Sequence, residues 1–334
     1  MPFYKNIALF PVFIRKVLHI PERLPRFVQI SLTNACNLSC RMCIRNYIDV
    51  ERRHMTWEDF TLIVDKLKGA EQISLAGMGE SLLHPRFFDA VAYCKERGFK
   101  VQLTTNALML RKPGTIARLL ASGVDTLSFS VESIQGYQES GHDNQEGVQA
   151  IEQLLDMRHQ QGRTTPKVVL QPILFKEKIQ DIYAMIPWGH EKGVDRFNIV
   201  RVDQRFVKDL ERPSVEEERV VFKELAKLRK RYGMRIDCLQ DQVFDGLAGW
   251  LYRHLKRWLR LDAWCYRFQD FIYVNVNGQV HPCCLDAEQV VGNLLTEDLD
   301  AIWHGEKFTY LRANQERFAY CRGCDFLRLK QVPQ

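Results

Sequence analysis

Segments with the pattern of β-strands alternate with segments with the pattern of α-helices from residue 27 to about residue 238. Short runs such as "RFVQISL" and "KVQLTTN" have strand character, and "TWEDFTLIVDKLKG" has the apolar spacing and cap residues of a helix. Strands that alternate with helices at this spacing predict β/α units around a parallel sheet. About six units are visible, fewer than the eight of a full TIM barrel. The expected fold class is therefore α/β, with a partial (β/α)6 TIM-like barrel.

The expected strands and helices follow one another along the chain. The strands are expected at residues 26–32, 72–77, 100–106, 124–132, 166–174 and 195–202, and the helices at 56–69, 84–98, 113–123, 144–162, 177–193 and 214–233. After the barrel a hairpin is expected at 271–284, because Asn277 and Gly278 form a turn between two alternating runs. With the short helices expected after it, this section predicts a small C-terminal α+β domain.

Unusual residues follow the strands of the expected barrel. The cysteine-rich "CNLSCRMC" follows the first strand, "GMGES" the second, "TTNA" the third and "SVES" the fourth. The carboxyl ends of parallel strands meet at one edge of a barrel, where the reactive residues of such folds gather. We therefore expect these four segments to form one site.

Ten cysteines occur in a chain whose composition is otherwise ordinary. Apolar residues make up 46% and charged residues 26%, as in a soluble globular protein. The net charge of +6 comes from scattered basic residues and does not indicate nucleic acid. No apolar run is long enough to span a membrane, and the N-terminus is not interpreted as a signal peptide. A cytoplasmic protein keeps its thiols reduced, so the clustered cysteines indicate metal binding or catalysis instead of disulfides.

Cys36, Cys40 and Cys43 lie within eight residues of one another. A structural zinc site takes four protein ligands and commonly begins with C-x-x-C pairs. Four thiolates fully ligate a 4Fe–4S cluster, whereas three leave one iron open to a substrate or cofactor. The spacing, together with the position after the first strand, favours a working iron–sulfur cluster over three coincidental packed cysteines.

The segment "CNLSCRMC" closely resembles the signature of the radical S-adenosylmethionine (radical SAM) enzymes, and the resemblance extends over roughly residues 27 to 205. "GMGESLLHP" resembles the family's glycine-rich segment, with Ser81 where a proline is usual. "TTNA" resembles its T-N-G segment, with Ala107 in place of the glycine. "SFSVES" resembles its S-L-D-G segment, with Glu132 where aspartate is common. The order of the segments, each at a strand end, identifies the chain as a member of this family.

The resemblance implies a chemistry and a set of binding residues. A 4Fe–4S cluster on Cys36, Cys40 and Cys43 would bind SAM at its open iron and cleave it with one electron, with flavodoxin or ferredoxin as the electron donor. The resulting 5′-deoxyadenosyl radical would take a hydrogen atom from the substrate, while the protein orients the partners and excludes water. The positions implied in SAM binding are Met42 near the adenine, Gly77, Gly79 and Glu80 at the methionine amino group, and Asn106 and Ser130.

The last quarter of the chain carries a second cysteine pattern. Cys265 is followed by Gly278 and Cys283 in a G-x4-C arrangement, and Cys321 and Cys324 form C-x-x-C. This pattern resembles the auxiliary-cluster domain called SPASM in its shortened, single-cluster "twitch" form. The resemblance implies one auxiliary 4Fe–4S cluster, fully ligated by these four cysteines.

Two alternatives at this second site stay open. Cys284 can replace Cys283 as a ligand, and four cysteines also suit a zinc ribbon. The isolated Cys94 and Cys238 are expected to pack as small hydrophobic residues.

A fully ligated second cluster is suited to electron transfer. After hydrogen abstraction, a substrate radical must lose an electron and a proton to become an oxidised product, and a nearby cluster can take that electron. We therefore expect an oxidoreductase that dehydrogenates a small sugar- or cyclitol-like alcohol, as an aminocyclitol dehydrogenase of this family does. A peptide- or protein-modifying maturase is the alternative, although the 26 residues before the barrel are too few for a peptide-binding module. A non-catalytic electron carrier would not explain the SAM-like segments.

Residues 244–261 have the pattern of a basic amphipathic helix. One interpretation is that this helix packs as a lid on the barrel. The other is that it makes peripheral contact with a membrane surface, or with an anionic or lipid-linked substrate. The basic residues on the face opposite its leucines are Arg253, Lys256, Arg257 and Arg260. The expected organisation is an N-terminal arm at 1–26, the radical SAM barrel at 27–238, this helix within an insertion at 239–262, and the SPASM/twitch domain at 263–334.

Overall fold

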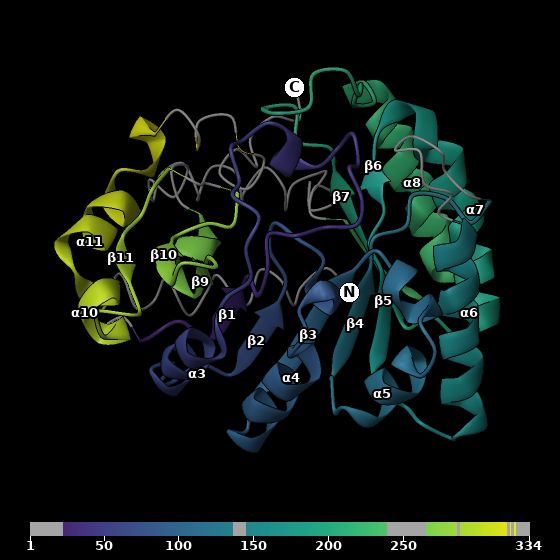
Figure 1. The fold of residues 1–334 in the computed structure, drawn as a ribbon. Helices are drawn as coiled ribbons and strands as arrows, with labels where there is room; N and C mark the ends of the chain where they lie inside the picture. The colour runs from purple at the N-terminus through teal and green to yellow at the C-terminus, as the bar shows by residue number, and fades with distance from the viewer. Residues whose placement is uncertain are drawn as a thin grey trace.

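The structure is a computed structural model that describes residues 23–135, 145–238, 265–285 and 288–318, together with Cys321 and Cys324. Within these ranges, β/α units form a curved, largely parallel sheet with helices on its outer face (Figure 1). This architecture confirms the expected α/β class and the partial TIM-like barrel.

All six β/α units lie within the ranges expected from the sequence. Their strands are β1 (Phe27–Ile30), β2 (Gln72–Leu75), β3 (Lys100–Thr105), β4 (Thr126–Phe129), β5 (Lys167–Leu170) and β7 (Arg196–Arg201). Their helices are α3 (Trp57–Asp65), α4 (Phe87–Glu96), α5 (Thr115–Ala121), α6 (Gln145–Gln160), α7 (Ile179–Lys192) and α8 (Val215–Tyr232).

Local sequence signals account for where several helices begin and end. Thr56 caps α3 by accepting a hydrogen bond from the Asp59 amide at 3.1 Å. Ser214 begins α8 with a reciprocal capping box to Glu217. Gly193, with a φ of 79°, ends α7 in the left-handed conformation that glycine adopts without a steric penalty.

The sheet continues past the barrel at both edges. Strand β8 (Arg235–Cys238) pairs with β7, and the short β6 (Ile173–Leu174) pairs with β7 near its carboxyl end. At the other edge β9 (Phe271–Val274) pairs in parallel with β1, followed by β10 (Gln279–His281) and β11 (Gly292–Asn293) in antiparallel order. The C-terminal hairpin, confirmed by the β9–β10 pair, thus extends the barrel sheet directly.

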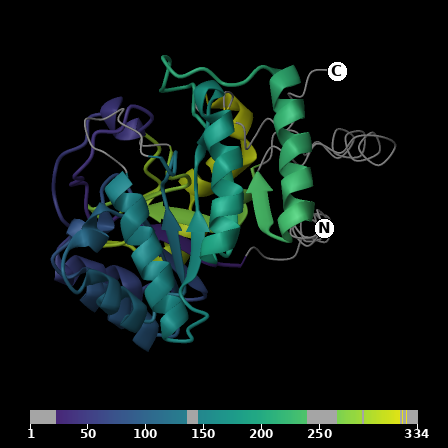
Figure 2. The same ribbon diagram turned by 90° about the vertical axis from the view of Figure 1, so that its right-hand side faces the viewer.

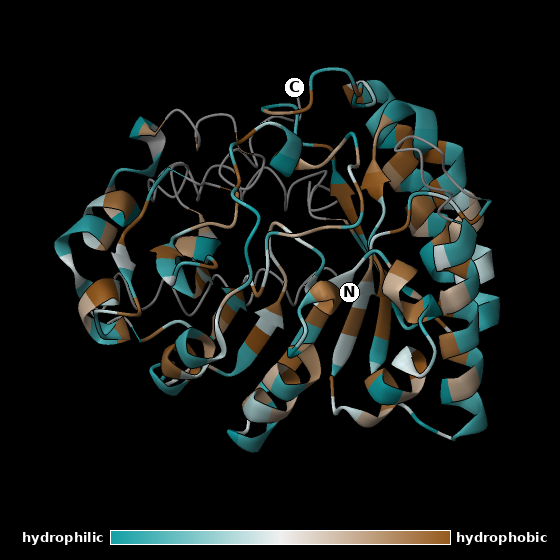
Figure 3. Ribbon diagram, viewed as in Figure 1, coloured by the Kyte–Doolittle hydropathy of each residue, from teal (hydrophilic) through white to brown (hydrophobic). Residues whose placement is uncertain are grey.

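The two faces of the barrel strands have opposite character. On the face toward the helices, alternate residues such as Ile30, Leu75 and Leu103 are completely buried in the main core. The apolar stripes of the helices meet this face, while their polar stripes point away (Figure 3). The residues between them on the strands point to the inside of the barrel, because side chains alternate along a strand. Many of these inner residues are polar, which matters for the site below.

Helices α7 and α8 pack against each other beside the last strands (Figure 2). The C-terminal section adds α10 (Leu299–His304) and α11 (Glu306–Ala313), which pack together next to the β9–β11 edge (Figure 1). No helix within the described ranges is long and apolar enough to cross a membrane. The expected basic helix at 244–261 lies outside the described residues.

Candidate active site

The three clustered cysteines lie on a tightly folded loop that follows β1. The Cys43 amide donates to the Cys40 carbonyl at 2.9 Å, and the Asn46 side chain donates to the same carbonyl at 2.7 Å. Arg45 reaches back to the Leu38 carbonyl at 2.6 Å. These local bonds hold the backbone between the cysteines in one conformation, and none of the three thiols forms a disulfide.

The thiols of this loop are close enough to act on one another electrostatically. Burial, followed by the charges of Cys43, Cys36 and Glu132, raises the pKa of Cys40 to about 12. Burial also raises the pKa of Cys36, which Arg45 opposes. A thiolate is therefore costly here without a compensating cation, and the irons of a cluster would supply that charge.

The three cysteines of this loop can be compared with the needs of a single metal ion and of an iron–sulfur cluster. Within the ranges that the structure describes, no three His, Cys, Asp or Glu side chains lie close enough together to hold one metal ion. A four-iron cluster spreads its cysteine sulfurs more widely than a single ion does. The donor set itself fits a cluster with an open iron, because Cys36, Cys40 and Cys43 are free thiols on one loop and interact electrostatically with one another.

The segment "GMGES" after β2 packs directly onto the loop that follows β1. A Cβ added to Gly77 would lie 2.1 Å from the Ser31 hydroxyl oxygen, and one added to Gly79 would lie 2.4 Å from the Ala35 carbonyl oxygen. The Glu80 amide donates to that same carbonyl at 2.9 Å. Both glycines are therefore required for this close approach. Their contact with SAM stays a prediction.

Glu80 is buried at the meeting point of three loops. Its carboxylate accepts hydrogen bonds from the Asn106 amide at 2.9 Å and from the Leu82 amide at 3.1 Å. Burial raises the pKa of Glu80, and the amide bonds and a bond from Thr105 oppose that rise. The Asn106 side chain in turn donates to the Asn37 side chain at 2.9 Å. Asn37, which lies inside the cysteine motif, was not singled out from the sequence, and its position directly after Cys36 was the available signal.

Ala107 shows why this family segment usually carries glycine. Its φ is 69°, in the left-handed region that L-residues avoid, and its side chain is completely buried. The conformation costs an alanine roughly 1–2 kcal/mol. The backbone geometry of the T-N-G segment is thus kept here despite the substitution.

Ser130 and Met42 each pack beside a different element. The Ser130 amide donates to the Thr105 carbonyl at 3.0 Å, which holds Ser130 beside the end of β3. Met42 packs on a small apolar cluster separate from the main core. The buried members of that cluster are Phe175, Val202, Val207 and Leu210. An apolar surface thus adjoins the cysteine loop, as an adenine ring would require.

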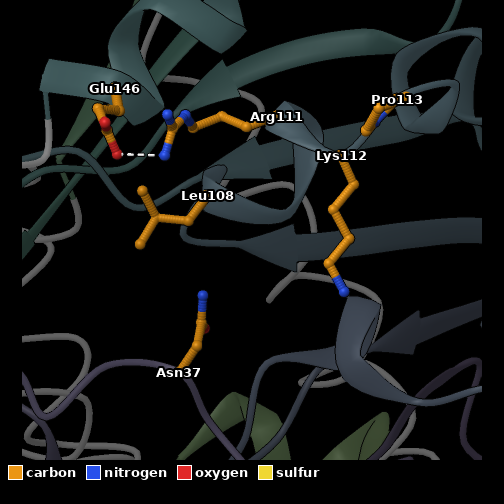
Figure 4. A pocket seen from close by; sticks show the side chains of 6 residues that line it. All are labelled: Asn37, Leu108, Arg111, Lys112, Pro113 and Glu146. Atoms are coloured by element: carbon orange, nitrogen blue, oxygen red, sulfur yellow. Dashed lines mark hydrogen bonds and ion pairs between the residues drawn. The ribbon is translucent and has the colours of Figure 1, made fainter.

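A cavity of about 500 Å³ opens beside the cysteine loop (Figure 4). Arg111 on its wall is paired with Glu146 at the start of α6, and Asn37 points into it from the opposite side. Its lining residues are Asn37, Leu108, Arg111, Lys112, Pro113 and Glu146. Because Asn37 also contacts Asn106, the cavity borders the predicted SAM site.

The second cysteine group lies next to the β9–β10 hairpin. The Cys265 amide donates to the Gln315 side chain at 2.6 Å, and the Cys324 amide donates to the Cys321 carbonyl at 3.0 Å. The charge of Cys324 acts on Cys265, so the first and last cysteines of the pattern are neighbours. Long-range packing thus gathers thiols that are separated by more than fifty positions in the chain.

Cys283 and Cys284 share a hydrogen bond that shifts their pKa values in opposite directions. That bond, followed by burial, raises the pKa of Cys283 well above its usual value. The same bond lowers the pKa of Cys284 to about 6, and Arg267 contributes in the same direction. Arg267, two residues after Cys265, acts on both thiols, and the choice of ligand between them stays a prediction.

Cys94 and Cys238 pack in the main core, where they are almost fully buried. Burial raises the pKa of Cys94 to about 12. The prediction that these two residues act as small hydrophobic side chains is confirmed.

The fold and its two cysteine sites define a class of protein. Residues 30–186 match the Radical SAM superfamily, and residues 265–325 match SPASM, an iron–sulfur cluster-binding domain. The chain belongs to the radical SAM superfamily and is a radical SAM enzyme with a SPASM domain. SAM and two iron–sulfur clusters are the cofactors of this domain pair, so the second site binds an iron–sulfur cluster and the zinc-ribbon alternative falls.

Two curated relatives align with nearly the whole chain. The tungsten-containing aldehyde ferredoxin oxidoreductase cofactor-modifying protein of Pyrococcus furiosus is 25% identical, over 92% of this chain and 91% of the relative. The AdoMet-dependent heme synthase of Methanosarcina barkeri is 23% identical, over 91% and 90%.

Solved structures share the fold at lower identity. Streptococcus suis SuiB bound to its precursor peptide SuiA has a TM-score of 0.72 and 16% identity, over 98% of this chain and 75% of SuiB. Native anSMEcpe with bound AdoMet has a TM-score of 0.63 and 14% identity, over 91% and 88%.

Proposed function

We propose that this enzyme is an oxidoreductase that dehydrogenates a hydroxyl-bearing small molecule of the sugar or cyclitol type. The alcohol carbon loses a hydrogen atom, and the resulting substrate radical loses one electron and one proton to become a carbonyl compound. When bound, the SAM cluster with SAM supplies the radical that removes the hydrogen atom, and the auxiliary cluster supplies the electron acceptor.

The polar interior of the barrel is the observation that supports this substrate class. The inner side chains of β2, β3 and β4 form a chain of hydrogen bonds, in which Gln72 donates to Gln102 at 3.0 Å and Gln102 donates to the Ser128 hydroxyl at 3.2 Å. On the next strands Asn198 donates to Gln171 at 3.2 Å. A full TIM barrel fills this space with branched apolar residues. Amides and hydroxyls suit a neutral substrate with many hydroxyl groups, which can replace these bonds one for one.

The residues of this chain would bind and orient the reactants. Cys36, Cys40 and Cys43 would hold the cluster that binds SAM, and Glu80 would accept hydrogen bonds from the methionine amino group of SAM. Asn106, through its contacts to Glu80 and Asn37, keeps the three loops in register. Their role is orientation and exclusion of water, because the cofactors carry the difficult step.

The other SAM contacts and the auxiliary ligands follow the family pattern. Gly77 and Gly79 would present backbone groups to SAM, Met42 would flank the adenine, and Ser130 would contact SAM from the end of β4. The auxiliary cluster would be held by Cys265, Cys283, Cys321 and Cys324. This assignment divides the chain into a barrel at 27–238 and a cluster domain at 263–334, with flavodoxin or ferredoxin as the external electron donor.

The curated relatives support a small molecule over a peptide. The two that align over nine-tenths of both chains are described as acting in cofactor modification and heme synthesis, which involve small molecules. The peptide seen with SuiB belongs to a protein that is 16% identical. A peptide-modifying maturase is therefore the second candidate, and it predicts a different response in the experiment below.

The proposal is tested with the reconstituted, chemically reduced enzyme and SAM. A panel of sugars and cyclitols, deuterated at their carbinol carbons, is compared with a panel of peptides. We expect one deuterium in 5′-deoxyadenosine and one carbonyl product with a member of the first panel. Deuterium transfer from a peptide alone would overturn the proposal.

A matched pair of variants connects that activity to the barrel interior. Asn198→Leu removes an inner amide, and we expect KM for the active polyol to rise at least about tenfold, since a partly buried polar partner is lost. Gln160→Leu makes the same chemical change at an exposed position of α6 and should leave KM unchanged. Equal effects of both variants on KM would show that the polar side chains inside the barrel do not bind the substrate.

A further inference from the structure

Arg267 lies beside two cysteines of the second site, Cys265 in the sequence and Cys284 through a hydrogen bond. It belongs to a single helical turn (Tyr266–Gln269) directly after Cys265, and its Nη1 donates to the Cys284 sulfur at 3.3 Å. The Phe271 ring lies on one side of the guanidinium, with its centre 5.5 Å away. A cation is therefore held against the Cys284 sulfur by a hydrogen bond, with an aromatic ring beside it.

The charge of Arg267 reaches several thiols of this site. Burial raises the pKa of Cys265 to about 11, and the Arg267 charge opposes that rise. The same charge opposes the upward shift at Cys283, which its hydrogen bond with Cys284 mainly causes. The guanidinium thus contacts the Cys284 sulfur, and its charge favours the ionised forms of Cys265 and Cys283.

A cation at this position bears directly on cluster reduction. A four-iron cluster with four thiolates is an anion, and reduction adds one more negative charge. Cluster potentials depend on net charge and on hydrogen bonds to the sulfurs. Arginine remains protonated in proteins, so its charge is present in both redox states. It favours the reduced state, which carries the larger negative charge.

We propose that Arg267 raises the reduction potential of the auxiliary cluster, which makes this cluster a better acceptor for the electron that leaves the substrate. The electron-acceptor role rests on the proposed function, whereas the effect on the potential does not. Arg267 acts through its charge beside Cys265 and Cys283, and also through its hydrogen bond if Cys284 is the ligand in place of Cys283; it is a tuning residue, not a catalytic one.

The charged side chains around the first cysteine loop are arranged differently from those around the second site. Arg45 acts on Cys36, but its hydrogen bonds go to backbone carbonyls and not to sulfur. The Glu80 and Glu132 carboxylates raise the pKa values of Cys36 and Cys40 after burial has done so. The hydrogen bond from Arg267 to a cysteine sulfur therefore distinguishes the second site from the first, where the hydrogen bonds of Arg45 go to the backbone.

The test isolates the auxiliary cluster in a background that lacks Cys36, Cys40 and Cys43. In this background the midpoint potential is measured by a redox titration monitored by electron paramagnetic resonance. Arg267→Gln should lower the potential by at least 59 mV, which is a tenfold change in a one-electron equilibrium. Arg267→Lys, which keeps the charge and loses the planar fork, should give a smaller decrease.

Arg118→Gln is the matched control, because Arg118 lies over the Phe88 ring at 3.9 Å in α5 of the barrel. It should leave the potential unchanged. An Arg267→Gln potential equal to that of the parent, at equal iron content, overturns the proposal. Loss of the cluster from Arg267→Gln also overturns it, since Arg267 would then hold the site together instead of tuning it.

This measurement is independent of the substrate. No SAM or alcohol is present, so a lowered potential supports the role of Arg267 whichever compound the enzyme oxidises. Failure of the dehydrogenase proposal would appear separately, as the absence of a carbonyl product from an enzyme whose potential still depends on Arg267.

Discussion

Replacing Gly79 with alanine would place a methyl group against the backbone of the loop that follows β1. The new Cβ would lie 2.4 Å from the Ala35 carbonyl oxygen and 2.5 Å from the Thr33 carbonyl oxygen, so the two loops must separate. Overpacking of this kind typically costs about 1–3 kcal/mol. Loss of the hydrogen bond from the Glu80 amide to Ala35, 2.9 Å long, adds about 0.5–1.5 kcal/mol. We expect the free energy of unfolding to fall by about 1.5–4.5 kcal/mol.

The assay is urea unfolding of the cluster-free protein under anaerobic conditions, compared with Gly98→Ala. Gly98 has a φ of +81° and no heavy atom within 4 Å of an added Cβ, so alanine there bears only the left-handed penalty of roughly 1–2 kcal/mol. In the reconstituted enzymes, the Gly79 variant should also lose SAM affinity, because Glu80 moves with the loop, whereas the Gly98 variant should retain it. A Gly79→Ala loss no larger than that of Gly98→Ala would refute the packing argument.

Three further predictions follow from the same structure. Glu80→Gln should weaken SAM binding at least about tenfold in equilibrium dialysis without changing the iron content, because it removes a buried negative charge; unchanged binding would contradict the assignment. Replacing Cys36, Cys40 and Cys43 together with alanine should reduce the iron content, measured colorimetrically, from about eight to about four per chain, and complete loss would mean that the two sites are not independent. Burial raises the pKa of Asp195, but hydrogen bonds from a backbone amide and two basic side chains lower it overall. The ionised form of Asp195 therefore stabilises the fold above the unfolded-state pKa of about 3.9. This contribution is lost as pH falls through the lower folded-state pKa. Asp195→Asn should therefore flatten the decline of stability in acid, which urea unfolding of the cluster-free protein between about pH 2 and 5 measures; an unchanged pH profile would refute this origin.

Most of the barrel could be predicted from local sequence patterns. The apolar periodicity and the cap at Thr56 locate α3 because helix formation depends on residues three or four positions apart. Strand β8 was missed, since Arg235 and Asp237 alternate with only two apolar residues in a four-residue segment. Its pairing with β7 is what makes it a strand. Short strands depend on their neighbours in the sheet more than on their own composition.

The location of the site could be predicted from the sequence, whereas several of its individual contacts could not. The order of the segments at the strand ends indicated one site, because parallel strands bring their carboxyl ends together. The contact between Asn37 and Asn106 joins residues 69 positions apart and has no local pattern. The sequence also suggested cofactor contact as the reason for Gly79, whereas the structure adds a steric reason in the neighbouring loop.

The sequence by itself determined the alternation of strands and helices, the two cysteine groups and their separation along the chain. These features depend on short periodicities and fixed spacings, which are present before the chain folds. Only the tertiary structure decided that β9 lies beside β1, that Gln102 contacts Ser128 inside the barrel, and that Arg267 reaches Cys284. Each of these contacts requires the register between strands or the path of a loop, and both result from burying apolar surface over the whole chain.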